Sequence, residues 1–229
     1  MGRLVEELDY QATPMGPISL RRRWVSAIDA DVYEVLLGDE HLMSSLFTVG
    51  ETQLATLGLE WARGDALRVL IGGLGLGYTA KAALDDPRVG QVEVVDVQAA
   101  VIDWQRQGLT PMGRTLADDP RCRLTHADFF QRFDGARGGW DVILLDIDHS
   151  PSRWLAPNHE LFYGEVSLHR MRNSLVDEGV FALWSDDPPD TDFLSRLESV
   201  FGQVDAPVVA FDNPLTGEPS HCTIYRARK

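Results

Sequence analysis

From Leu67 onward, short apolar runs alternate with segments of helical periodicity. The run "LRVLI" (67–71) precedes "YTAKAALDD", and "QVEVVD" (91–96) precedes "VQAAVIDWQRQ". The run "WDVILLDID" (140–148) is apolar at nearly every position, as in a strand that helices cover on both faces. This alternation of strand and helix predicts an α/β fold with a doubly wound, Rossmann-like mixed sheet.

The same patterns predict the other elements of this sheet. The third strand is expected in "RCRLTHAD" and the fifth in "VFALWS". One helix is expected over 159–175, with Gly179 just beyond its C-terminal end. A helix over 191–201, capped by Asp190 or Thr191, leads to a final hairpin of two strands.

The first 47 residues have a different pattern, with large and β-branched apolar residues in "PISLRRRWV", "DVYEVLL" and "HLMSSLFTV". Gly38 and Asp39 suit a tight hairpin turn, because both residue types tolerate positive φ. A helix is expected from Glu51 to Arg63. We therefore expect a small N-terminal β-hairpin appendage (1–50) before the Rossmann-like domain (51–229).

Charge and composition exclude several classes of partner. The chain of 229 residues has a net charge of −14, and its pI is near 4.7. This charge repels nucleic acid and is compatible with a cationic small molecule. No apolar stretch is long enough for a membrane span or a signal peptide, and two cysteines make neither a disulfide framework nor a metal site. We expect a cytoplasmic protein with no metal, nucleic-acid or membrane partner.

Glycines or carboxylates follow four successive predicted strands. Ligands of doubly wound sheets bind beyond the carboxyl ends of the strands, so these positions are expected to share one site. In chain order they are Gly73, Gly75 and Gly77, then Asp96, then Asp128, then Asp146 and Asp148.

Each position has a chemical reason. Glycines leave no Cβ between the backbone and a ligand. An acid about 20 residues after the loop, here Asp96, is placed to accept both hydroxyls of a ribose. Asp128 can accept the amine of adenine, and the acids after the fourth strand face a positively charged sulfonium or amine. Alternatives remain: Asp96 and Asp128 can cap helices, and His149 can be an ordinary loop residue.

A dinucleotide is the rival ligand, because "GLGYTA" also matches the pattern G-x-G-x-x-A. A pyrophosphate, however, prefers a helix N-terminus without nearby carboxylates. Asp146 and Asp148 therefore favour a sulfonium nucleoside over a dinucleotide.

Three segments carry a resemblance to a known family: "VLIGGLGLGYTAKAALDDPRVGQVEVVD", "DPRCRLTHADFF" and "WDVILLDIDHSP". In these the chain resembles the class I S-adenosylmethionine-dependent methyltransferases, and within that fold the spermidine synthase (polyamine aminopropyltransferase) superfamily. The resemblance implies S-adenosylmethionine or its decarboxylated form as the cofactor, a small-molecule acceptor and a homodimer.

The resemblance also implies a role for each site residue. Asp146 orients the ammonium group of the ligand, and Asp148 or His149 steers or deprotonates the acceptor. The acceptor pocket is formed by Gln53, Trp154 and Tyr163, with the alternative that the two aromatic residues belong to the core. The nucleoside is held by Gly73, Leu74, Gly75 and Gly77 in the loop, by Asp96 and Val97 at the ribose, and by Asp128 and Phe129 at the base.

The chain also departs from the family pattern. Where the family loop reads "GGGDG", Gly73 to Gly77 read "GLGLG", which puts Leu76 in the place of the acid. His149 takes the place of the second acid of "DSSDP", and of the family's "YHE" only Glu51 and Gln53 are polar candidates. We therefore favour methyl transfer to a small molecule over aminopropyl transfer, with a non-catalytic nucleoside-binding protein as a third alternative.

Overall fold

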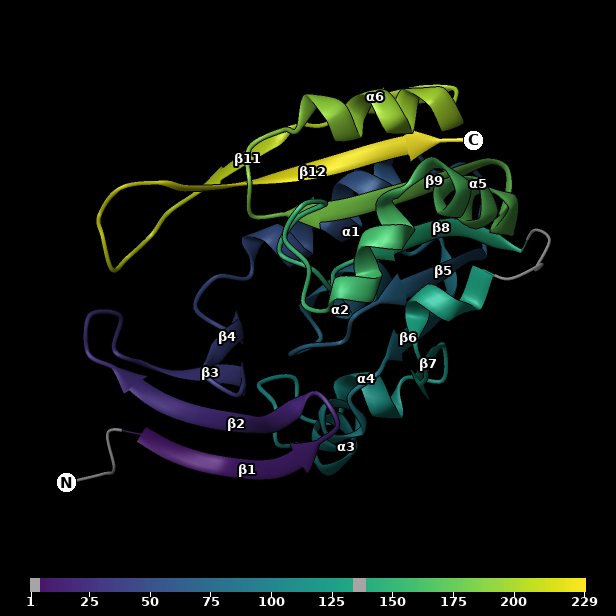
Figure 1. The fold of residues 1–229 in the computed structure, drawn as a ribbon. Helices are drawn as coiled ribbons and strands as arrows, with labels where there is room; N and C mark the ends of the chain where they lie inside the picture. Colours follow the sequence, from purple (N-terminus) through teal and green to yellow (C-terminus); the bar gives the residue numbers. More distant parts are fainter. Residues whose placement is uncertain (1–4, 134–138) are drawn as a thin grey trace.

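The computed structural model describes residues 5–133 and 139–229, and these form two sheets (Figure 1). The N-terminal sheet is an antiparallel meander in the order β1-β2-β3-β4. Its strands are β1 (Val5–Thr13), β2 (Gly16–Val25), β3 (Ala30–Leu37) and β4 (Glu40–Ser44). The predicted hairpin turn lies between β3 and β4, where Gly38 has φ 60°. The strand β1 has no counterpart among the strands predicted from the sequence.

The second sheet has the predicted doubly wound topology. Its order is β10-β12-β9-β8-β5-β6-β7, and β11 pairs with β12. The five strands from β7 to β9 are parallel, whereas β12 is antiparallel to β9. The strands are β5 (Leu67–Gly72), β6 (Val89–Asp96), β7 (Cys122–His126), β8 (Trp140–Leu145), β9 (Leu175–Ser185), β10 (Gln203–Asp205), β11 (Val208–Phe211) and β12 (Ser220–Arg228).

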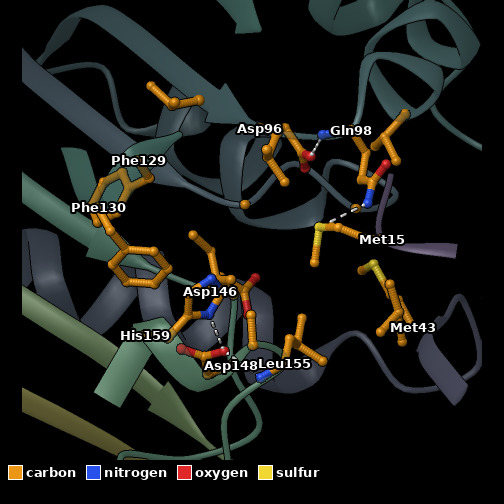
Figure 2. A pocket seen from close by; sticks show the side chains of 18 of the residues that line it. Met15, Met43, Asp96, Gln98, Phe129, Phe130, Asp146, Asp148, Leu155 and His159 are labelled. Atoms are coloured by element: carbon orange, nitrogen blue, oxygen red, sulfur yellow. Dashed lines mark hydrogen bonds and ion pairs between the residues drawn. The ribbon is translucent and has the colours of Figure 1, made fainter. Parts of the chain in front are cut away.

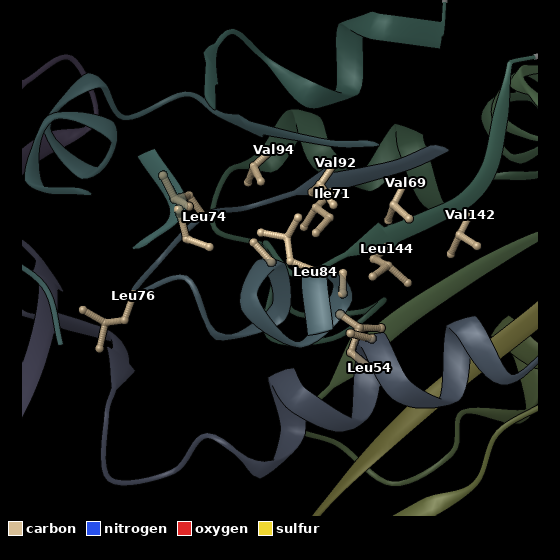
Figure 3. Packing of buried hydrophobic residues seen from close by; sticks show 14 of the residues in the cluster. Leu54, Val69, Ile71, Leu74, Leu76, Leu84, Val92, Val94, Val142 and Leu144 are labelled. Carbon is tan, nitrogen blue, oxygen red and sulfur yellow. The ribbon is translucent and has the colours of Figure 1, made fainter. Parts of the chain in front are cut away.

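Alternating side chains of the buried strands face two helical layers. Val142 and Leu144 of β8 belong to one core, and Ile143 and Leu145 belong to the other. Figure 3 shows part of the first core, in which side chains of β5, β6 and β8 pack against Leu54 and Leu84. Helices of this layer are α1 (Val49–Trp61), α2 (Tyr78–Asp85), α3 (Ala99–Gln107) and the short α4 (Thr115–Asp118).

The other layer differs from the prediction. The helix expected over 159–175 is two pieces, a 3₁₀ segment η2 (Pro157–Tyr163) and the helix α5 (Glu165–Ser174). They are separated at Gly164, whose extended backbone (ψ 154°) ends the first piece and caps the second. Gly179 lies inside β9, so its assignment to the end of that helix was wrong. A second 3₁₀ segment, η1 (Phe129–Phe133), and α6 (Thr191–Val200) complete this layer.

The α6 helix begins where the sequence predicted. The Asp190 carboxylate accepts the backbone N–H groups of Asp192 at 2.8 Å and Phe193 at 3.2 Å. We expect Asp190→Ala to lower the free energy of unfolding by about 1 kcal/mol, because two helix-end donors lose their acceptor. Urea denaturation measures this loss. Ser195→Ala, inside the same helix, is the control and should cost nothing; equal losses in both variants would contradict the capping role.

The N-terminal sheet packs on the larger one through shared apolar core. Ile18, Leu20 and Val35 are buried in the same cluster as the helices α1 to α3. The indole N–H of Trp104 in α3 donates to the Asp9 carboxylate of β1 at 2.6 Å. None of the described helices combines the length and apolar character that crossing a membrane requires.

Candidate functional site

A cavity of about 290 Å³ lies at the carboxyl ends of β5, β6, β7 and β8 (Figure 2). The strand order reverses here, because β6 lies on one side of β5 and β8 on the other. The N-terminal sheet closes the opposite side with apolar residues, among them Met15, Ile18 and Met43. We call this cavity the nucleoside pocket.

Two of the predicted loop glycines line the nucleoside pocket. Gly73 and Gly75 have φ of 91° and 47°, and a Cβ on Gly73 would overlap the Asp146 carbonyl oxygen. Gly77 instead stands at the start of α2, where a Cβ would meet Leu116. The Leu74 side chain is buried in the core. Gly77 and Leu74 are not among the residues that line the pocket, and their contact with the cofactor stays a prediction.

Leu76 does not face the ligand either. Its side chain is fully buried in the apolar core. The loop position that faces the pocket is Gly75, and the Met43 Sδ atom occupies the space that a side chain there would take. The Leu76 backbone N–H also lies 2.9 Å from that sulfur. The predicted contrast between Leu76 and a family acid was thus placed at the wrong residue.

Asp96 ties the loop to the end of β6. Its carboxylate accepts the backbone N–H groups of Leu74 at 2.9 Å and Gln98 at 2.7 Å. Burial raises the pKa of Asp96, and these backbone hydrogen bonds oppose the rise. A carboxylate has about four acceptor sites, so these backbone donors leave acceptor capacity for a hydroxyl group in the pocket. The neighbouring Val97 also lines the pocket.

Asp128 is a cap, one of the two roles that the sequence left open, and its contact with adenine stays a prediction. It accepts the Phe130 N–H at 2.9 Å, at the start of η1, and it lines the nucleoside pocket. Gln131 donates to its other oxygen at 2.8 Å. Phe129 lines the same pocket, and its ring lies against Gly72 so closely that a Cβ there would clash.

A pair of half-buried carboxyl groups lies at the β5–β8 side of the pocket. Asp146 accepts the Thr79 hydroxyl at 2.7 Å, and Glu51 enters from the first turn of α1. Burial, with the Asp146 charge as the second cause, raises the pKa of Glu51 to about 8. Burial raises the pKa of Asp146 to about 6. Two neighbouring acids that resist ionisation together are suited to hold a cation.

Asp148 is buried and has three hydrogen-bond partners. Its carboxylate accepts the Leu155 N–H at 2.8 Å and the Tyr163 hydroxyl at 2.7 Å, and it lies 2.8 Å from Nδ1 of His159. Burial, reinforced by Asp148, raises the pKa of Tyr163, so its hydroxyl stays a donor. With these three partners, Asp148 is fixed in place and positions the groups around it.

The charge of the pocket is one-sided. No lysine or arginine is among the described residues that line it. The lining carboxyl groups are Glu51, Asp96, Asp128, Asp146 and Asp148.

Comparison with known proteins finds relatives of one kind, by sequence and by structure. A polyamine aminopropyltransferase of Synechococcus sp. (strain JA-2-3B'a(2-13)) is 30% identical over 122 residues, which cover 53% of this chain and 38% of that protein. The Bacillus subtilis polyamine aminopropyltransferase is 26% identical over 120 residues. The Thermotoga maritima spermidine synthase structure superposes with a TM-score of 0.75 at 19% identity, covering 97% of this chain and 72% of that one. The chain is thus similar in sequence to polyamine aminopropyltransferases, and it has the fold of the spermidine synthase structures.

This fold is of the class I methyltransferase type. A second spermidine synthase structure, in complex with the transition-state analogue AdoDATO, superposes with a TM-score of 0.76 and 18% identity over 97% of this chain. In sequence the matched region is about two-fifths of the curated relatives' length. No family model matches the chain.

Three residues predicted for the acceptor are not among the lining residues of the two described cavities. Tyr163 is buried behind Asp148, and Trp154 donates to the Pro151 carbonyl; neither lines a described cavity. Gln53 lines neither cavity, because it lies off the face of α1 that carries Glu51. His149 lines the nucleoside pocket, but its Nε2 lies 2.9 Å from the Glu40 carboxylate of β4.

The sequence analysis missed His159 and left Glu51 without a role. Glu51 precedes the buried Leu54 and Ala55 by three and four residues, so it lies on the buried face of α1. An acid on an apolar helical face is a signal that the sequence contains. His159 has no such signal, since its place depends on how η2 packs.

Proposed function

We propose that this chain binds decarboxylated S-adenosylmethionine and transfers its aminopropyl group to an amine. The supporting observation is the one-sided charge of the nucleoside pocket, with five carboxyl groups and no lysine or arginine among its described lining residues. Ordinary S-adenosylmethionine carries a carboxylate that this pocket repels. The decarboxylated form carries only positive charge, and the Glu51–Asp146 pair offers its ammonium group two counter-charges.

The reaction is a displacement at the propyl carbon beside the sulfonium. The lone pair of a neutral amine forms the new C–N bond, the C–S bond breaks, and its electron pair stays on sulfur as the thioether 5′-methylthioadenosine. The attacking nitrogen then loses one proton to a base. Because the sulfonium is already an activated leaving group, the chain's main task is to position the two reactants.

A second cavity indicates the path of the acceptor. This cavity of about 720 Å³ shares Met43, Glu51, His149 and Trp184 with the nucleoside pocket and extends towards the loop between β11 and β12. An amine in it reaches the nucleoside pocket beside Glu51.

Our preference for methyl transfer depended on Leu76 as a ligand contact. The Leu76 side chain is buried in the core, so it does not distinguish the two cofactors. The curated relatives bear the name polyamine aminopropyltransferase, which favours the aminopropyl alternative.

Isothermal titration tests the proposal with both forms of the cofactor. We expect decarboxylated S-adenosylmethionine to bind at least about tenfold more tightly than S-adenosylmethionine, because one unfavourable buried charge is absent. Tighter binding of S-adenosylmethionine would overturn the proposal.

Mass spectrometry of the products separates the chemical alternatives. With decarboxylated S-adenosylmethionine and a series of aliphatic diamines, we expect 5′-methylthioadenosine and an aminopropylated amine in equal amounts. Formation of S-adenosylhomocysteine from S-adenosylmethionine would instead support the methyl-transfer alternative. Tight binding without turnover on any amine would support the non-catalytic alternative.

A further inference from the structure

His159 has a polar ring nitrogen that the reaction just described does not use. The side chain lines the nucleoside pocket from η2, and its Nδ1 lies 2.8 Å from the Asp148 carboxylate (Figure 2). A carboxylate only accepts hydrogen bonds, so Nδ1 is the protonated nitrogen of the neutral ring. The lone pair of the imidazole is therefore on Nε2.

The Nε2 atom of His159 is available to groups in the pocket. It has no hydrogen-bond partner recorded among the described residues. Among the described residues, the side-chain nitrogens that are enclosed by protein and have no partner belong to Arg172, Trp184 and Arg228. Nε2 of His159 is not in this group, so it is not enclosed by protein. An unpartnered acceptor on a side chain that lines a cavity is available to a ligand.

The ring lies at the base end of the pocket. Its centroid is 4.2 Å from that of Phe130, two residues after Asp128 at the carboxyl end of β7. Phe130 also packs on Phe162 of η2, at 4.9 Å between centroids, which fixes η2 against η1. Asp148 and Phe130 thus hold the imidazole from two sides.

We propose that His159 and Asp128 together recognise the 6-amino group of the bound adenine. This inference rests on the proposed function, which places an adenosyl ligand here. The amine has two N–H donors, and the site presents two acceptors, the Asp128 carboxylate and Nε2 of His159. Hypoxanthine has a carbonyl oxygen at that position, which would face both lone pairs. His159 is thus a determinant of base specificity, and Asp148 is its positioning residue.

Titration of 5′-methylthioadenosine and 5′-methylthioinosine tests this inference. We expect wild-type protein to prefer the adenine compound by at least about 100-fold, because two acceptors would oppose the carbonyl. In His159→Phe, which keeps a ring against Phe130 but has no acceptor, this ratio should fall about tenfold. His159→Gln, whose amide oxygen can accept the amine, should keep most of it.

His169→Phe is the matched control, because this exposed histidine of α5 does not line the pocket, and its ratio should equal that of wild type. An unchanged ratio in His159→Phe would overturn the inference, even with turnover lost, because the histidine would then act on the acceptor's proton. Binding of neither nucleoside would overturn the proposed function and this inference with it.

Wild-type protein alone provides a second measurement that does not depend on the folding of a variant. The N6,N6-dimethyl analogue of 5′-methylthioadenosine has no amine hydrogen to donate. It should bind at least about tenfold more weakly than the parent compound. Equal affinity of the two compounds would show that neither acceptor contacts the amine, and would overturn the inference while leaving the proposed function in place.

Discussion

Asp96→Ala should lower the affinity for adenosyl ligands by at least about 100-fold, the largest loss expected from any single change in the nucleoside pocket. The variant removes a charged acceptor for two ribose hydroxyls, and each such hydrogen bond contributes about 1.5–3 kcal/mol. It also leaves the backbone N–H groups of Leu74 and Gln98 without their partner, which loosens the glycine loop. Isothermal titration with 5′-methylthioadenosine measures the loss.

Two controls separate the ribose contact from general damage. Asp103→Ala removes a carboxyl group on α3 that does not line the pocket, and it should bind as wild type does. The 2′-deoxy ligand removes one hydroxyl and should lose part of the affinity on wild-type protein alone. Full affinity in Asp96→Ala would place the ribose elsewhere in the cavity.

The sheet and one edge of the site could be predicted from the sequence. Runs such as "WDVILLDID" are apolar on both faces, which allows little besides a central parallel strand. Once the strands are parallel, their carboxyl ends share one edge, so Asp96, Asp128 and Asp146 had to lie together. The structure places all three in the lining of one pocket.

The rest of the site depends on packing between distant segments. Met43 reaches the pocket because the N-terminal sheet packs on the glycine loop, 32 residues later in the chain. His159 lies there because Asp148 and Phe130 hold η2 in place, where helical periodicity had predicted a continuous helix. Spacing along the sequence contains no information on either contact. Asp146 and Asp148, two residues apart, therefore looked alike in the sequence. Asp146 belongs to the carboxyl pair with Glu51, whereas Asp148 is buried among hydrogen-bond donors.

The second large effect is expected at Glu51, whose substitution should change binding and stability in opposite directions. Glu51→Gln removes one of the two counter-charges for the ligand ammonium. We expect its affinity for decarboxylated S-adenosylmethionine to fall about 10- to 100-fold, the usual range for a buried charge-assisted hydrogen bond. Affinity for 5′-methylthioadenosine, which has no ammonium group, should change much less. Equal losses for both ligands would contradict the assignment of Glu51 to the ammonium.

The raised pKa of about 8 also predicts how this binding depends on pH. Below pH 8 the free protein holds a proton on Glu51 that the cationic ligand must displace. Affinity should therefore rise as pH increases from 6 to 8, by up to about tenfold per pH unit for each proton released. The ligand amine, with an ordinary pKa near about 10.4, stays charged throughout. Glu51→Gln should flatten this profile.

The stability of the ligand-free protein depends on pH in the opposite direction to ligand binding. The pKa of Glu51 is higher in the folded protein, about 8 against 4.5, so the folded state binds the proton more strongly. The stability that this provides is present below pH 4.5 and is lost as pH rises through 8. The side chain of Glu51→Gln is always neutral. At pH 9 the free energy of unfolding of this variant should therefore be about 1–3 kcal/mol higher than that of wild type, with little gain at pH 4.

Glu60→Gln is the control on the same helix, because its carboxylate is exposed and pairs with Arg226. It should give no gain at either pH, and a gain at pH 9 in both variants would mean that the overall negative charge, not the Glu51–Asp146 pair, destabilises the fold.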